Sequence, residues 1–163
     1  MGPLERAHGA GLRIGVACSL FNGGITTRLL DGALQGLASA SVDRADITLG
    51  WVPGAFELPL AARRLVDQGA DAVVCLGAVI RGDTSHYDFV AGECASGLAR
   101  VGLDTGVPVI FGVLTTENVD QALERARPDD TNKGLEAARS AVQMASMLRE
   151  LGPVGSRATG AGV

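Results

Sequence analysis

The chain is poor in the residues that mark metal sites, disulfide scaffolds and membrane spans. Its 163 residues include three cysteines and two histidines, and no C-x-x-C pair is present. A zinc site needs ligands at paired spacing, so we expect no metal ion. The cysteines Cys18, Cys75 and Cys94 lie in apolar contexts, which favours free, buried thiols of a cytoplasmic protein.

Long apolar runs and basic charge are also scarce. No run approaches the roughly 20 residues that span a bilayer, and residues 1–11 carry no apolar segment typical of a secretory signal, so no membrane partner is expected. Lys and Arg number 14 against 18 Asp and Glu, which gives a net charge of −4. Without a basic stripe such a chain is a poor binder of nucleic acid. Neither G-x-G-x-x-G nor a Walker A sequence occurs, so the sequence predicts no nucleotide cofactor.

Apolar segments of two kinds make up most of the chain, in which 47% of residues are hydrophobic and 20% charged. Short apolar runs predict strands, and apolar residues at helical spacing predict helices between and after them. The expected strands span residues 12–18, 47–51, 71–80 and 107–114, and the expected helices 25–37, 56–66, 86–101, 118–127 and 133–151. Parallel connections need crossovers of about a dozen residues or more, so this alternation predicts an α/β/α domain with a four-stranded parallel sheet. The domain is expected over residues 12–151, between a flexible arm (1–11) and a flexible tail (152–163).

Ligands of such sheets bind beyond the carboxyl ends of the strands, so the segments after the strands are candidate sites. Residues 81–88 read Arg-Gly-Asp-Thr-Ser-His-Tyr-Asp and lead from a strand into a helix. Ser85 and Asp88 have capping-box spacing, which predicts Ser85 as the N-cap of a helix start that could seat a phosphate. The carboxylate of Asp83 opposes that seat unless only its backbone N–H takes part. His86 is either a proton-transfer group beside the bound anion or a surface histidine near a helix cap.

Other strand-end residues also allow two interpretations each. Glu57 complements the dipole of its helix or accepts hydrogen bonds from a polar ligand. Phe21, on a Gly-rich loop, is a stray core residue or a platform for stacking, and Phe111, inside the last strand, is core by default. Arg125 and Arg127 match the negative end of a helix or bind phosphate through their guanidinium groups.

Four stretches together match a known family in order. They read Leu-Phe-Asn at 20–22, Val-Pro-Gly-Ala-Phe-Glu at 52–57, Gly-Ala-Val-Ile-Arg-Gly at 77–82 with Thr84, His86, Tyr87 and Asp88 following, and Pro-Val-Ile-Phe-Gly-Val-Leu-Thr-Thr-Glu-Asn at 108–118, then Arg125 and Asn-Lys-Gly at 132–134. In these motifs the chain resembles the lumazine synthases over about residues 12–151. The resemblance implies a flavodoxin-like fold and, without a cofactor, the penultimate step of riboflavin biosynthesis. In that step 5-amino-6-(D-ribitylamino)uracil and 3,4-dihydroxy-2-butanone 4-phosphate condense to 6,7-dimethyl-8-ribityllumazine.

The resemblance also implies roles for individual residues. Contacts to the pyrimidine and its ribityl chain would come from Phe21, Ala55, Phe56, Glu57, Ala78, Val79, Ile80 and Phe111. Asp83, Thr84 and Arg125 would bind phosphate, with Asn22 and Lys133 as further candidates, and His86 would move protons. Phe111 and Arg125 would reach in from the neighbouring subunit of a homo-oligomer built on pentamers.

The turn at 126–133 departs from the family, where it usually reads Ala-Gly-x-Lys-Ala-Gly-Asn-Lys. Here Asp129 stands where many members have Lys, and Arg127 and Thr131 replace glycines. In the family this turn borders the contacts that decide whether pentamers close into capsids, so the resemblance implies a pentamer here and leaves the capsid open. Losing a lysine near the phosphate would weaken substrate binding unless Arg127 or Lys133 compensates.

Three rival functions remain open at this stage. The chain could be a catalytically silent lumazine- or flavin-binding homologue, although His86, Arg125 and Glu57 are all retained. It could serve mainly as a shell protein, because assembly and catalysis use different surfaces. An unrelated flavodoxin-like binding module would require the four matches to be accidental.

Overall fold

The computed structural model describes residues 8–153, in which strands and helices alternate as the sequence predicts. The elements are β1 (Ile14–Ser19), α1 (Gly23–Ser39), the 3-10 turn η2 (Arg44–Asp46), β2 (Ile47–Val52), the 3-10 turn η3 (Ala55–Glu57), α2 (Leu58–Asp67), β3 (Ala72–Ile80), α3 (His86–Thr105), β4 (Val109–Thr116), α4 (Val119–Arg125) and α5 (Lys133–Leu151). The strands form one parallel sheet in the order β2-β1-β3-β4. The predicted α/β class with a four-stranded, flavodoxin-like parallel sheet is therefore confirmed.

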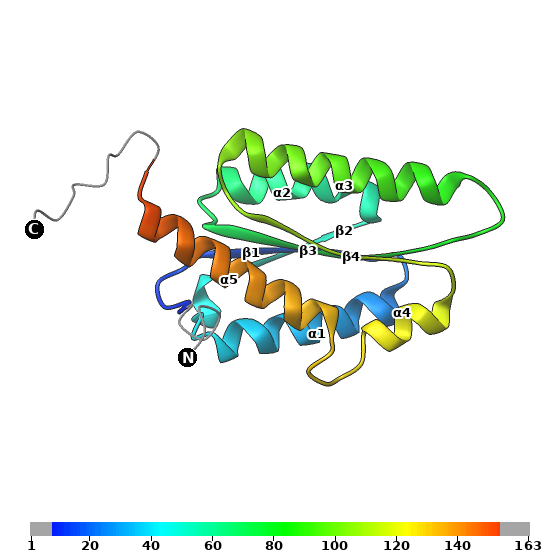
Figure 1. Ribbon diagram of the computed structural model, residues 1–163, viewed down its shortest axis with the longest axis horizontal. Coiled ribbons are helices and arrows are strands. Elements are labelled where there is room, and N and C mark those ends of the chain that lie inside the picture. Colours follow the sequence, from blue (N-terminus) through cyan, green and yellow to red (C-terminus); the bar gives the residue numbers. More distant parts are fainter. Residues whose placement is uncertain (1–7, 154–163) are drawn as a thin grey trace, which may run out of the picture.

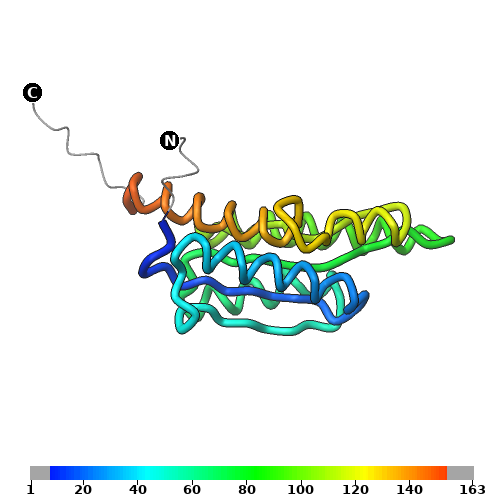
Figure 2. The backbone as a smooth tube through the Cα atoms, turned by 90° about the horizontal axis from the view of Figure 1, so that it is seen from below, coloured from blue at the N-terminus to red at the C-terminus, as the bar shows by residue number. Residues whose placement is uncertain are grey.

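Helices cover both faces of this sheet. Figure 1 shows α2 and α3 on one face and α1, α4 and α5 on the other, which makes three layers. Seen from below in Figure 2, α1 and α5 run side by side across their face of the sheet. Because the strands are parallel, the segments that follow them all emerge at one edge of the sheet, where the predicted site residues are expected.

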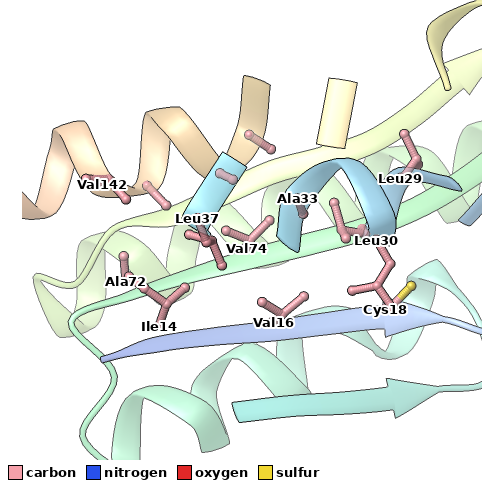
Figure 3. Packing of buried hydrophobic residues seen from close by; sticks show 14 of the residues in the cluster. Ile14, Val16, Cys18, Leu29, Leu30, Ala33, Leu37, Ala72, Val74 and Val142 are labelled. Carbon is pink, nitrogen blue, oxygen red and sulfur yellow. The ribbon is translucent and has the colours of Figure 1, made fainter. Parts of the chain in front are cut away.

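The core is aliphatic, with one cluster on each side of the sheet. Between the sheet and the α1–α5 layer, Figure 3 labels Ile14, Val16, Cys18, Leu29, Leu30, Ala33, Leu37, Ala72, Val74 and Val142, all of them buried. The central strands β1 and β3 are covered on both faces, as the unbroken apolar run at 71–80 predicts. The edge strand β4 is buried mainly in its second half, although its sequence is also a continuous apolar run.

No aromatic ring belongs to the buried core of the described residues. The chain has four phenylalanines and one tryptophan, and all five side chains are exposed, from 43% at Phe111 to 70% at Phe21. The default assignment of Phe111 to the core is wrong, because β4 is an edge strand and this residue lies in its exposed half.

Helices α1 and α5 approach closely around one buried amide. A Cβ on Gly134 would overlap the Leu29 carbonyl, so only glycine fits at this crossing. Asn132, the N-cap of α5, accepts hydrogen bonds from the Gly134 and Leu135 backbone N–H groups. Its amide nitrogen donates to the carbonyls of Arg28 and Arg127, at 3.2 and 2.9 Å. This side chain therefore joins α1, α5 and the turn that precedes α5.

Three further predictions concern the termini and the cysteines. The predicted arm and tail fall largely on residues 1–7 and 154–163, which lie outside the described residues, so the domain limits stay predictions. Across residues 8–153, no helix has both the length and the apolar character needed to cross a bilayer. All three cysteines are free and buried, as expected.

Candidate functional site

A cavity of about 740 Å³ opens at the carboxyl edge of the sheet, where parallel sheets bind their ligands. Its walls come from the segment after β1, the β2–α2 connection, the end of β3 and the start of α3. The predicted residues that line it are Phe21, Ala55, Phe56, Glu57, Ala78, Val79, Ile80, Thr84 and His86. Asp83 is exposed and is not part of the wall, although both of its neighbours, Gly82 and Thr84, are.

The backbone around Phe21 is held by two other strand ends. The Phe21 N–H donates to the Pro53 carbonyl at 3.0 Å, which joins the segments after β1 and β2. Asn22 adopts a left-handed conformation with φ 58°, and its amide nitrogen donates to the Ala78 carbonyl at 2.9 Å. The Phe21 ring is thus fixed at its base while its face stays open. This arrangement favours a stacking platform over a stray core residue.

Glu57 performs the local task that its position predicts. In the turn η3 its carboxylate oxygen Oε2 accepts a hydrogen bond from the Gly54 N–H at 3.0 Å, which closes the turn that begins α2. Within the described part of the chain, Oε1 has no hydrogen-bond partner, and the side chain is exposed at the cavity wall. One carboxylate can therefore cap the turn and still accept from a hydroxyl group of a ligand.

The predicted capping box at the start of α3 does not form. Ser85 is the N-cap, but with φ −70° and ψ 0° it is nearly helical, and its side chain makes no capping hydrogen bond. A capping hydroxyl reaches the first turn from an extended backbone, and Ser85 does not have one. The His86 N–H instead donates to the Thr84 hydroxyl oxygen at 3.3 Å. His86 is exposed at the cavity rim, which agrees with either interpretation of it.

Six residues of the cavity wall received no role from sequence: Pro53, Gly54, Gly82, Tyr87, Phe89 and Val90. Tyr87 and Phe89 lie beside His86 in the first turn of α3, and Phe89 is 66% exposed. Phe89 follows His86 by three residues, and positions three apart lie on neighbouring surfaces of a helix. That spacing was a usable signal, because the helix start was predicted correctly.

Phe111, Arg125 and Lys133 lie outside this cavity. They border a smaller hollow of about 270 Å³ along the edge strand β4 and α5. Phe111 belongs to the same alternating row of β4 as Val109 and Val113, which pack on the α3 face of the sheet. Next to this hollow, Arg127 lies with Arg125 and Lys133 around a further depression of about 510 Å³. Asp129 of the altered turn accepts hydrogen bonds from the Thr131 N–H and hydroxyl, which holds the pKa of its carboxyl below the usual value. One protomer thus divides the predicted residues between two places.

The three buried cysteines line neither the cavity nor the two depressions beside β4 and α5. Burial raises the pKa of Cys18 and of Cys94 to about 11, and burial together with the neighbouring Cys94 raises the pKa of Cys75. Thiols with such pKa values stay protonated and are poor nucleophiles. Among residues 8–153, no three or more His, Cys, Asp and Glu side chains lie close enough together to hold a metal ion.

A comparison with protein families covers most of the chain. The family model for 6,7-dimethyl-8-ribityllumazine synthase matches residues 11–149 of the chain. The match spans every strand of the sheet and each predicted site residue from Phe21 to Lys133. The chain therefore belongs to the 6,7-dimethyl-8-ribityllumazine synthase family.

Proposed function

We propose that this chain condenses 5-amino-6-(D-ribitylamino)uracil with 3,4-dihydroxy-2-butanone 4-phosphate to form 6,7-dimethyl-8-ribityllumazine. The observation that carries the proposal is the 740 Å³ cavity. Its lining includes the open ring face of Phe21, the carboxylate of Glu57 with one free oxygen, and the imidazole of His86. The volume of the cavity lies within the range of about 300–1,000 Å³ typical of small-molecule sites. Phe21 would stack on the pyrimidine, and Glu57 would accept from ribityl hydroxyl groups.

The reaction needs proton transfer at each step. The 5-amino group attacks the ketone and expels water to give an imine, and phosphate is then eliminated to leave an enol that tautomerises to a ketone. The ribitylamino nitrogen attacks this ketone and expels a second water as the ring closes. His86 at the cavity rim can give and take these protons near neutral pH. The remaining acceleration would come from holding two substrates side by side. Thr84 and the backbone beside it would hold the phosphate next to His86.

The two separate hollows support a site shared between subunits. Arg125 and Phe111 do not line the cavity of their own protomer and border instead the hollow along β4 and α5. In a ring of copies, the surface of one protomer around β4 and α5 would cover the cavity of the next. Arg125 would then contact the phosphate, and Phe111 would lie against the heterocycle. Arg127 shares a depression with Arg125 and Lys133, which supports its compensating for the missing lysine. A pentameric assembly, a cytoplasmic location and the absence of cofactor, metal, nucleic-acid and membrane partners stay predictions.

The test is to mix the two substrates with purified protein and record the absorbance and fluorescence of the lumazine product, with released phosphate as a second readout. Product above the spontaneous rate is expected, with phosphate released in equal amount. In parallel, His86→Ala should lower turnover and leave affinity for the pyrimidine nearly intact. Product formation no faster than in buffer would refute the enzyme proposal. Retained binding of the lumazine in that case would favour the silent binding homologue.

A further inference from the structure

Arg81 joins two chain segments at the carboxyl edge of the sheet. Its backbone N–H donates to the Thr116 carbonyl at 2.9 Å and extends the β3–β4 ladder beyond the last registered pair. Its guanidinium Nε lies 2.9 Å from Oε2 of Glu117, in the corner that follows β4. The same group lies 3.6 Å from Oδ1 of Asp88, and its Cζ is 4.3 Å from the centre of the Tyr87 ring.

The segment 81–86 has few other attachments, and after it Tyr87 packs half-buried against the core beneath α3. Residues 81–86 are all exposed, and Ser85 makes no capping bond. The side-chain hydrogen bond within the segment joins Thr84 and the His86 N–H. Within the described residues, the ion pairs and ring contacts that bind the first turn of α3 to the β4–α4 corner are those of Arg81.

The corner on the other side of this link is itself braced. The Glu117 N–H donates to Oε1 of Gln121 in α4 at 2.8 Å, and the Thr116 hydroxyl donates to the Asn118 carbonyl at 2.9 Å. Arg81 therefore attaches the start of α3 to a corner with its own hydrogen bonds. His86, Tyr87 and Asp88 are consecutive in one helical turn, so contacts that fix Tyr87 and Asp88 also fix the direction in which the His86 side chain leaves the helix.

Only a guanidinium can make this set of contacts. A single exposed ion pair contributes little, and its geometry is loose. Arginine is planar, so it can stack on an aromatic ring while its edge binds carboxylates, whereas lysine offers a point charge on a flexible stem. The Arg81 side chain is 40% exposed, and Arg81 does not line the cavity.

We propose that Arg81 is a positioning residue, which holds the first turn of α3 against the β4–α4 corner so that His86 keeps one direction at the cavity rim. This inference rests on the proposed function, since proton transfer is the task that needs a fixed imidazole. Catalytic groups lose activity steeply when they are misplaced by about 1 Å. The loss should appear in kcat, because Arg81 contacts none of the residues that would stack on the pyrimidine.

The test compares Arg81→Met and Arg81→Lys with a control in α3, the helix that Arg81 holds: Arg100→Met. Arg100 forms an exposed ion pair with Asp104, 3.6 Å away, and lies outside the cavity. We expect Arg81→Met to lower kcat about tenfold or more with KM for the pyrimidine within about twofold, little rescue by lysine, and no change in the control. A proportionate rise in KM with kcat intact, or full rescue by lysine, would overturn the inference.

A second readout separates this inference from the proposed function. The chain has two histidines, His8 and His86, so a sample labelled with 13C at the histidine Cε1 position gives one imidazole line for each, assigned by His8→Gln. Arg81→Met should shift or broaden the His86 line and leave the His8 line in place. An unchanged His86 line would refute the inference even if the parent chain makes product. If the parent makes none, the proposed function fails, and the His86 line alone decides whether Arg81 holds that side chain.

Discussion

Asn132→Ala tests whether the buried amide between α1 and α5 holds the fold together. The side chain is 2% exposed and makes four hydrogen bonds, as acceptor from the Gly134 and Leu135 N–H groups and as donor to the Arg28 and Arg127 carbonyls. Loss of the N-cap costs about 1 kcal/mol. The part-buried hydrogen bonds to the Arg28 and Arg127 carbonyls are lost as well, which adds about 1 kcal/mol for each bond. The expected loss in the free energy of unfolding is therefore about 3 kcal/mol.

The matched control is Asn118→Ala, which removes the N-cap of α4. Asn118 is exposed and its side chain accepts from the Gln121 N–H at 2.9 Å, so the expected loss is about 1 kcal/mol. Urea unfolding followed by far-ultraviolet circular dichroism measures both variants, at one protein concentration because assembly would shift the midpoint. If Asn132→Ala costs no more than Asn118→Ala, the buried amide contributes as a cap alone, and its bonds to Arg28 and Arg127 add nothing.

Two predictions follow from the separation of the hollows and from the burial of the thiols. His86→Ala should lower turnover and Arg125→Ala should weaken binding of the phosphate substrate, so each chain alone should be strongly impaired. Co-assembled in equal amounts they should regain about one quarter of parental activity, since one adjacent pair in four would combine both intact groups. Activity that stays absent after verified mixing would place both groups in the site of one chain. For the cysteines, burial raises the pKa of Cys18 and Cys94 to about 11, so their thiolates form only toward that pH. A thiol reagent at pH 8 should label none of the three cysteines in the folded chain and all of them in urea, and rapid labelling without denaturant would contradict this.

Much of the fold could be predicted from local patterns. The unbroken apolar run at 71–80 marks a strand covered on both faces, and β3 occupies that central place. Phe111 was misassigned because an apolar residue in an apolar run carries no mark of whether its strand lies at the centre or the edge of the sheet. Strand order is a property of the whole sheet, and it leaves this ring exposed.

The site was less accessible to sequence reasoning where it depends on distant partners. Glu57 caps the turn at Gly54, three residues away, and this local role could be anticipated. The failed cap at Ser85 depends on a backbone conformation near the helical region, which residue type does not specify. The pairing of Arg81 with Glu117 joins residues far apart in sequence and needs the β3–β4 register to be known.

Every phenylalanine and the single tryptophan lie at the surface, so the tryptophan fluorescence of the chain comes from one exposed position. Trp51 is 44% exposed at the end of β2, two residues before Pro53 of the cavity wall, so its emission reports on what approaches that edge. The remaining aromatic ring, Tyr87, is half-buried against the core beneath α3. Quenching of Trp51 emission in the folded chain can therefore follow the approach of a ligand to the cavity edge through a single tryptophan.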